Sequence, residues 1–281
     1  THIMINEKKA IISTISDLCK KMGLNYTTNV KSSMWRADVV VKHESYKVAF
    51  NVCKMPRNAE YTYTAMKNEG VLGCWLLLPS KNSSNIRPNL PCFSVQTQTD
   101  KVYVYLNTRD DFDLVNIFEL PVFIHYFING KIKFVERAEI DKVELCIYKR
   151  RCWKCQSEFD LYCVSRLFSK DGAVISRQYL EDYVCSDEFI ELNPIVIRAF
   201  KNYMQDHPGI FDMRAIKSRY SRTCDQTYTS FGCPRCDSIY GKWFFSDDIQ
   251  AQRHGEDLMC TLVVSLDEVI TVSVSCWSTV S

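Results

Sequence analysis

The chain has 281 residues, of which 46% are hydrophobic and 24% charged, and its formal net charge is +2. This composition is that of one large or two ordinary globular domains. The nearly balanced charge excludes a surface that is basic throughout, so binding to nucleic acid would require local clusters of cations.

In chain order, the expected elements of the first half are a helix at 5–22, strands at 24–30, 35–42 and 46–53, a helix at 58–69, strands at 73–78, 91–97 and 101–106, a helix at 111–129, and strands at 131–135 and 142–149. Helices are expected where apolar residues recur every three to four positions, and strands where they alternate or form short apolar runs. Gly23 and Gly70 follow the first two helices as stop signals. This order predicts a mixed α/β sheet.

The pattern changes after about residue 150, where we expect helices near 178–185 and 194–204 and strands near 258–265 and 268–275. We therefore predict two parts, an α/β domain at 4–148 and an α+β region at 149–281.

The 14 cysteines bear on the compartment as well as on metal binding. We find neither a signal peptide nor an apolar run of about 18 residues, so we expect a cytoplasmic protein with reduced thiols and no membrane partner. A disulfide-rich secreted protein is the alternative.

The strands at 35–42 and 46–53 predict a hairpin with its turn at 44–45. This register places Asp38 opposite Asn51 and Arg36 opposite Cys53, on one face of the sheet. The other face would be entirely apolar, formed by Ala37, Val39, Val41, Val48, Phe50 and Val52. A polar cluster is thus expected beside a buried sheet.

Residues 5–80 resemble the PD-(D/E)XK nucleases, and within them the branch of the competence protein CoiA. The resemblance rests on Arg36-Ala-Asp38-Val-Val, on Tyr46-Lys-Val-Ala-Phe-Asn51-Val-Cys53, on the helix with Glu60, and on Gly70-Val-Leu-Gly-Cys-Trp75-Leu-Leu. It implies a restriction-endonuclease-like fold. It also implies a site where an Asp on one strand and an acid-x-Lys on the next bind Mg²⁺ or Mn²⁺.

The chain departs from that catalytic pattern at two positions. The family's acid falls on Asn51 and its Lys or Gln on Cys53, so only Asp38 matches. Glu60 could supply a displaced carboxylate, although an acid in the first turn of a helix is also stabilised there by the helix dipole. Lys54 is expected on the opposite face. We therefore expect weak nuclease activity or none.

Two Cys-x-x-Cys pairs, Cys152 with Cys155 and Cys233 with Cys236, predict one structural Zn²⁺ held by four thiolates. Ordinary buried thiols or a redox-active Cys-Pro-Arg-Cys pair are the alternatives. The second half resembles the zinc-ribbon extension of some bacterial proteins of this kind.

Basic residues beside both pairs are candidate phosphate contacts, together with two near the hairpin. They are Lys149, Arg150, Arg151, Lys154, Lys217, Arg219 and Arg222, with Arg36 and Lys54 from the first half. The alternative for these clusters is a solvated charged face.

The resemblance implies a bacterial or phage protein of DNA processing or defence. The leading hypothesis is a DNA-associated protein with a degenerate nuclease site. The alternatives are an active Mg²⁺- or Mn²⁺-dependent nuclease with a rearranged site that uses Asp38 and Glu60, and a non-enzymatic defence or anti-defence factor that binds a protein partner.

Overall fold

The computed structural model describes residues 2–44, 46–54, 56, 58–79, 87–107, 116–181, 189–213, 215–251 and 258–281. The chain divides into two compact units, residues 1–135 with 275–281, and residues 136–274. The expected division at 148/149 is displaced, because the strand at the junction continues on both sides of it and the last residues of the chain return to the first unit.

The first unit is built on a seven-stranded mixed sheet in the order β1-β2-β3-β4-β5-β6-β7. Its elements are α1 (His2–Lys21), β1 (Asn25–Lys31), β2 (Arg36–His43), β3 (Tyr46–Cys53), α2 (Ala59–Asn68), β4 (Val71–Leu77), β5 (Cys92–Gln98), β6 (Lys101–Tyr105), β7 (Ile117–Glu119) and α3 (Leu120–Ile128). The strands β1 to β3 form an antiparallel meander, and β3, β4 and β5 run parallel. The helix α2 supplies the crossover that parallel β3 and β4 require.

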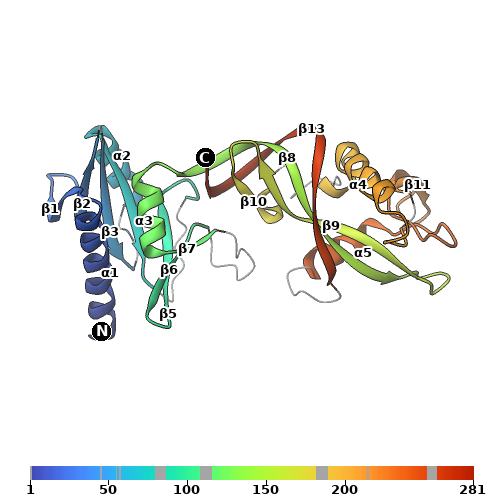
Figure 1. Ribbon diagram of the computed structural model, residues 1–281, viewed down its shortest axis with the longest axis horizontal. Helices are drawn as coiled ribbons and strands as arrows, with labels where there is room; N and C mark the ends of the chain where they lie inside the picture. The colour runs from blue at the N-terminus through green and yellow to red at the C-terminus, as the bar shows by residue number, and fades with distance from the viewer. Residues whose placement is uncertain are drawn as a thin grey trace. The chain divides into compact units, whose positions relative to one another are not determined.

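Both faces of this sheet are covered. Figure 1 shows α1 and α3 over one face, where Ile11 and Ile15 of α1 and Phe123 of α3 join the main core. On the other face α2 contributes Ala65 and Met66 to a second, smaller core. Gly23 ends α1 with a φ of 68°, a left-handed conformation that glycine adopts without steric cost.

The second unit contains a four-stranded antiparallel sheet in the order β10-β9-β8-β13 and a separate ladder of β11 with β12. Its elements are β8 (Ile132–Arg151), β9 (Glu158–Ser169), β10 (Val174–Ser176), 3₁₀ turns at Arg177–Tyr179 and Ile190–Leu192, α4 (Pro194–Asp206), β11 (Lys217–Ser221), β12 (Gln226–Ser230), α5 (Lys242–Ala251) and β13 (Leu258–Thr279). The buried Glu191 accepts hydrogen bonds from Arg177 Nε at 2.7 Å and from Val164 N at 3.1 Å.

Several expected elements differ from the structure. The strands expected at 131–135 and 142–149 are one strand, β8, because Ala138 and Ile140 keep their alternate buried positions between charged neighbours. The strands expected at 258–265 and 268–275 are also one, β13. Its Asp267 and Glu268 resemble a turn in sequence, but both carboxylates pair with Arg198 of α4 from within the strand.

Two expected helices are shorter or replaced. The helix expected at 111–129 begins only at Leu120, directly after β7, and Pro121 lies in its first turn. Residues 111–115 of that expectation lie outside the described residues. The helix expected at 178–185 is a 3₁₀ turn followed by a bridge from Leu180 to Val274, and 182–188 are also outside the described residues.

No helix among the described residues is long and apolar enough to cross a membrane.

Candidate functional site

The hairpin of β2 and β3 has the predicted register. Val39 pairs with Phe50 and His43 with Tyr46, which is the opposition that a turn at 44–45 requires. Beyond the last pair, the Asp38 carboxylate replaces a backbone acceptor, and its Oδ2 accepts a hydrogen bond of 2.7 Å from Val52 N.

The predicted division of the two faces holds with one exception. Val39, Val41, Val48, Phe50 and Val52 all lie in the main core. Ala37, expected with them, packs in the second core with Trp35 and Ala49. The face expected to be polar is therefore partly apolar under α2, and its polar residues gather where the strands end.

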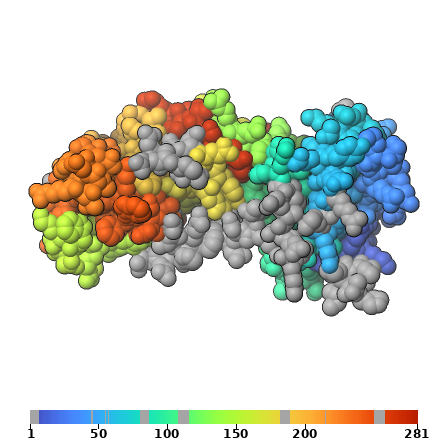
Figure 2. Space-filling view, turned by 180° about the vertical axis from the view of Figure 1, so that it is seen from behind, coloured from blue at the N-terminus to red at the C-terminus, as the bar shows by residue number. Residues whose placement is uncertain are grey.

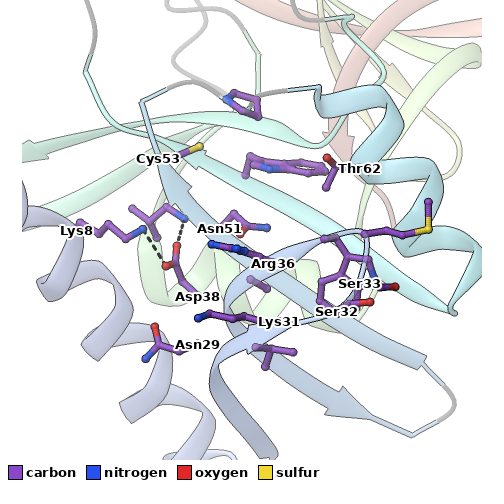
Figure 3. Close-up of a pocket in the computed structure, with 17 residues that line it drawn as sticks. Lys8, Asn29, Lys31, Ser32, Ser33, Arg36, Asp38, Asn51, Cys53 and Thr62 are labelled. Carbon is purple, nitrogen blue, oxygen red and sulfur yellow. Dashed lines mark hydrogen bonds and ion pairs between the residues drawn. The ribbon is translucent and has the colours of Figure 1, made fainter.

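At these strand ends lies a cavity of about 590 Å³. It is lined by residues of α1, of β1 and the turn after it, of β2, of the end of β3, and of α2 and β4. Figure 3 shows Lys8, Lys31, Arg36, Asp38 and Asn51 around it. The sequence-predicted residues Arg36, Asp38, Asn51 and Cys53 all line this cavity, as the hairpin register implies.

The charges of the cavity are mostly positive. Lys8 of α1 pairs with Asp38 Oδ1 at 2.9 Å, so this cation neutralises the one acidic side chain among the described residues of the lining. Lys31 and Arg36 are exposed, and within the described part of the chain neither forms an ion pair. The cavity therefore has two uncompensated cations.

Two N–H donors in the cavity wall have no partner among the described residues. They are Nε1 of Trp35, a residue only 7% exposed, and Nδ2 of Asn51. A buried donor without a partner costs about 1–3 kcal/mol.

Glu60 and Lys54, both sequence candidates, do not line the cavity. Glu60 lies in the first turn of α2 and accepts from Arg87 Nε at 2.7 Å. Lys54 follows β3 and is exposed. Glu60 therefore lies outside the lining of the cavity that holds Asp38.

The donor set of the cavity does not suit a hard divalent cation. Mg²⁺ prefers an octahedral set of oxygen ligands supplied in part by carboxylates. Here the lining offers one carboxylate, and both its oxygens are engaged by Lys8 and by Val52 N. The two uncompensated cations favour an anion instead.

The four predicted cysteine ligands converge in the second unit, with all four Sγ atoms within 4.8 Å of one another. The Sγ atoms of Cys152 and Cys236 lie 3.6 Å apart, and those of Cys155 and Cys233 lie 3.5 Å apart. These separations exceed a disulfide bond of about 2.05 Å. They approach the roughly 3.8 Å edge of a tetrahedron with Zn–S bonds of about 2.3 Å. In Figure 2 the segments that carry the two pairs lie side by side on the surface. The cluster can thus hold a metal ion such as zinc.

The two cysteine pairs sit in turns of the same form. In each turn the N–H of the first Cys donates to the carbonyl of the Ser five residues later, Ser157 or Ser238. Gln156 and Asp237, each directly after the second Cys, adopt left-handed φ values of 61° and 56°. The two segments thus have the same turn geometry, and we call each turn a knuckle.

The two serines were missed by the sequence analysis, although both follow the second Cys by two residues. Ser157 Oγ lies 3.0 Å from Cys155 Sγ and 3.3 Å from Cys233 Sγ, and Ser238 Oγ lies 3.1 Å from Cys236 Sγ. Burial raises the pKa of Cys233, but the hydrogen bond from Ser157 and nearby backbone N–H groups outweigh it and lower the pKa to about 6. Hydroxyl donors of this kind stabilise thiolates, the form that binds metal.

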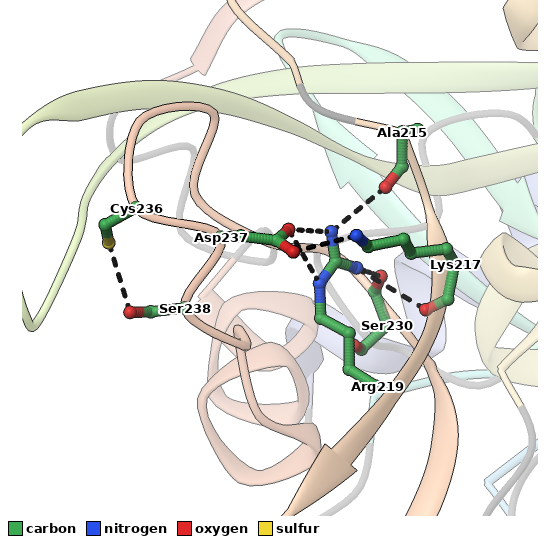
Figure 4. A network of polar contacts seen from close by, with 7 residues as sticks. All are labelled: Ala215, Lys217, Arg219, Ser230, Cys236, Asp237 and Ser238. Atoms are coloured by element: carbon green, nitrogen blue, oxygen red, sulfur yellow. Dashed lines mark hydrogen bonds and ion pairs between the residues drawn. The ribbon is translucent and has the colours of Figure 1, made fainter.

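Arg219 and Asp237 support the second knuckle (Figure 4). Arg219 is 8% exposed and donates to Asp237 Oδ1 from Nη2 at 2.9 Å and to the carbonyl of Ser230 at 2.6 Å. Its guanidinium packs against Gly232, where an added Cβ would lie 2.5 Å from Arg219 Cζ. Gly232 is thus required by close approach of the arginine.

Most cations predicted as phosphate contacts around the knuckles form ion pairs within the protein. Lys149 pairs with the buried Asp160, and Arg150 with the buried Asp248. Arg151 pairs with Glu158 at the surface.

Around the second knuckle, Lys217 and Arg219 share Asp237. Lys154 and Arg222 have no ion pair among the described residues. Structure-supporting pairs thus account for much of the basic clustering seen in the sequence.

Comparisons with protein-family models, with curated proteins and with solved structures find no match to this chain.

Proposed function

We propose that this protein binds DNA through the cavity at the ends of β2 and β3 and does not cleave it. The single observation that carries the proposal is the charge of the cavity. Among the described residues, Lys31 and Arg36 have no ion-pair partner, and the one carboxylate of the lining, Asp38, is neutralised by Lys8. Cations placed in this way contact phosphates, which supply most of the affinity of proteins for nucleic acid.

The order of elements supports a restriction-endonuclease-like scaffold beneath this cavity. The helix, three-stranded meander, helix and parallel strand from α1 to β4 follow the order that the resemblance to PD-(D/E)XK nucleases implies. The resemblance makes Asp38 the counterpart of that family's strand acid and Asn51 the counterpart of its second acid, and both residues line the cavity. We infer a degenerate nuclease site in which the Lys8 ammonium takes the place of the metal ion beside Asp38.

The four-cysteine cluster has a structural role in this proposal, with zinc as its metal. Four thiolates leave no open coordination position, so the ion would hold the two knuckles together and take no part in chemistry. A bacterial or phage setting in DNA processing or defence follows from the resemblance alone.

The experiment is the salt dependence of affinity for double-stranded DNA. Replacing Lys31 and Arg36 together by Gln removes two phosphate contacts. The negative slope of log affinity against log salt should therefore become shallower by about 1.8. The matched control is Lys42→Gln with Lys47→Gln, two exposed cations that face each other across the same hairpin outside the cavity.

An unchanged slope in the cavity variant, or an equal loss in the control, would refute the placement of the DNA.

A second candidate function, the binding of a protein partner, is favoured by exposed aromatic side chains in the second unit. Trp243 is 78% exposed, Trp153 59% and Phe244 56%. Aromatic residues are enriched at the centres of protein interfaces. This candidate predicts no DNA binding at low salt and a stable complex that Trp243→Ala disrupts.

A further inference from the structure

The cavity is a pocket of small-molecule size as well as a charged surface. Its volume of about 590 Å³ falls in the range of roughly 300–1,000 Å³ typical of ligand pockets. Two tryptophans line it, Trp35 and Trp75, and both are more than nine-tenths buried. A backbone phosphate alone would leave much of this volume empty, so the ligand should bring a larger group with it.

The charge balance of the lining points to a dianion. Among the described lining residues, Lys8, Lys31 and Arg36 against Asp38 leave a surplus of two positive charges. An internal phosphodiester carries one negative charge, whereas a phosphate monoester carries about −1.5 to −2 near pH 7. The lining thus matches a terminal phosphate better than an internal one.

The unpartnered donors point to the same chemistry. Trp35 Nε1 and Asn51 Nδ2 can only donate, and each lacks an acceptor among the described residues. A phosphate monoester presents three strong acceptor oxygens. In Figure 3 the ends of Lys31 and Arg36 point toward the region beside Asp38 and Asn51, so the two cations and the Asn51 amide lie around one space.

We propose that the cavity binds a nucleotide unit that ends in a phosphate monoester, with the phosphate held by Lys31 and Arg36 and the rest of the nucleotide along the tryptophan-lined wall. This inference rests on the proposed function and names the part of the DNA that enters the cavity, a phosphorylated strand end. A free nucleotide offers the same chemistry, and the experiment separates the two sources.

The experiment measures binding of four probes to the full chain by calorimetry at fixed ionic strength. They are a short single-stranded DNA with a 5′-phosphate, the same strand with a 3′-phosphate, the same strand with hydroxyls at both ends, and deoxyadenosine 5′-monophosphate. We expect one phosphorylated end to bind at least tenfold tighter than the hydroxyl strand, because charge-assisted hydrogen bonds are the strong ones. We expect the mononucleotide to compete for the same site.

Two variants test whether the preference for a phosphorylated end arises in the cavity. Arg36→Gln, at an exposed position, should abolish the preference for the phosphorylated end while leaving the fold intact. Trp35→Phe removes the indole N–H together with one ring of the cavity wall; it should reduce the preference severalfold. The circular dichroism spectrum and unfolding midpoint of each variant establish that it is folded.

The outcomes separate the binding of a phosphorylated strand end from the proposed binding of DNA. Equal affinity for phosphorylated and hydroxyl strands would overturn this inference and leave the proposed DNA binding standing. Tight binding of the mononucleotide with no binding of either phosphorylated strand would assign the pocket to free nucleotides and overturn the strand end. A preference that survives in Arg36→Gln would overturn the location, and no binding of any DNA would overturn both proposals.

Discussion

Replacing Gly232 by alanine tests how the second knuckle is supported. An added Cβ would lie 2.5 Å from Arg219 Cζ, 2.6 Å from Nη2 and 2.7 Å from Nε. Ordinary contacts between carbon atoms are about 3.5–4.0 Å, so the guanidinium would have to retreat by roughly 1 Å. It cannot do so freely, because it donates to the carbonyls of Ser230 and Ala215 and to the Asp237 carboxylate.

The size of the effect follows from these contacts. Overpacking of a filled site costs about 1–3 kcal/mol. A hydrogen bond to a charged group is worth about 1.5–3 kcal/mol, and at least one would be weakened by the shift. We therefore expect Gly232→Ala to lower the free energy of unfolding of the second unit by about 3 kcal/mol. Zinc should also pass to a chelator faster, since Asp237 adjoins the ligand Cys236.

The assay is urea unfolding followed by tryptophan fluorescence, with zinc release followed by a colorimetric chelator. Gly241→Ala is the matched control, because the nearest atoms to its added Cβ are 3.8 and 3.9 Å away, which is ordinary contact. The free energy of unfolding of the control should stay within about 1 kcal/mol of wild type. Any change should be an increase, because alanine lowers the conformational entropy of the unfolded chain. A Gly232→Ala variant as stable as Gly241→Ala would refute this account of the arginine.

Three further predictions concern the metal, the buried charge and the degenerate site. Protein purified without chelator should contain one zinc per chain, and Cys233→Ser should lose it and several kcal/mol of stability, since metal binding contributes folding energy; a variant that retains zinc would contradict the ligand set. Glu191→Ala should cost about 3–5 kcal/mol because it leaves the guanidinium of Arg177, only 17% exposed, without its carboxylate, whereas Arg198→Ala, which breaks two exposed pairs, should cost under about 1 kcal/mol; similar losses in denaturant titrations would refute the distinction. Asn51→Glu combined with Cys53→Lys rebuilds an acid-x-Lys on β3, so we expect calorimetry to detect Mg²⁺ binding that wild type lacks, and no gain would count against the nuclease-like scaffold.

The parts of the fold that local pattern dictates could be predicted from the sequence. Alternation in two adjacent strands gave their faces, a supposed two-residue turn at 44–45 gave the register, and spacing gave the four clustered cysteines. The register put Asp38 and Asn51 on one face, and both line the cavity.

Contacts between distant residues could not be predicted in the same way. Nothing local to Lys8 indicates that it pairs with Asp38, and nothing in the Asp267-Glu268 pair indicates that Arg198 keeps it inside a strand. The basic residues beside the knuckles looked like a nucleic-acid surface for the same reason, because their acidic partners are remote in sequence, as with Arg150 and Asp248.

The most direct test of the central proposal is to mix the purified protein with single- and double-stranded DNA, with Mg²⁺ and with Mn²⁺, and to follow both mobility shift and cleavage. We predict a shift that weakens steeply with added salt and no cleavage with either metal. Cleavage that Asp38→Ala abolishes would contradict the account, because it would require Asp38 to hold a metal ion where the structure pairs it with Lys8.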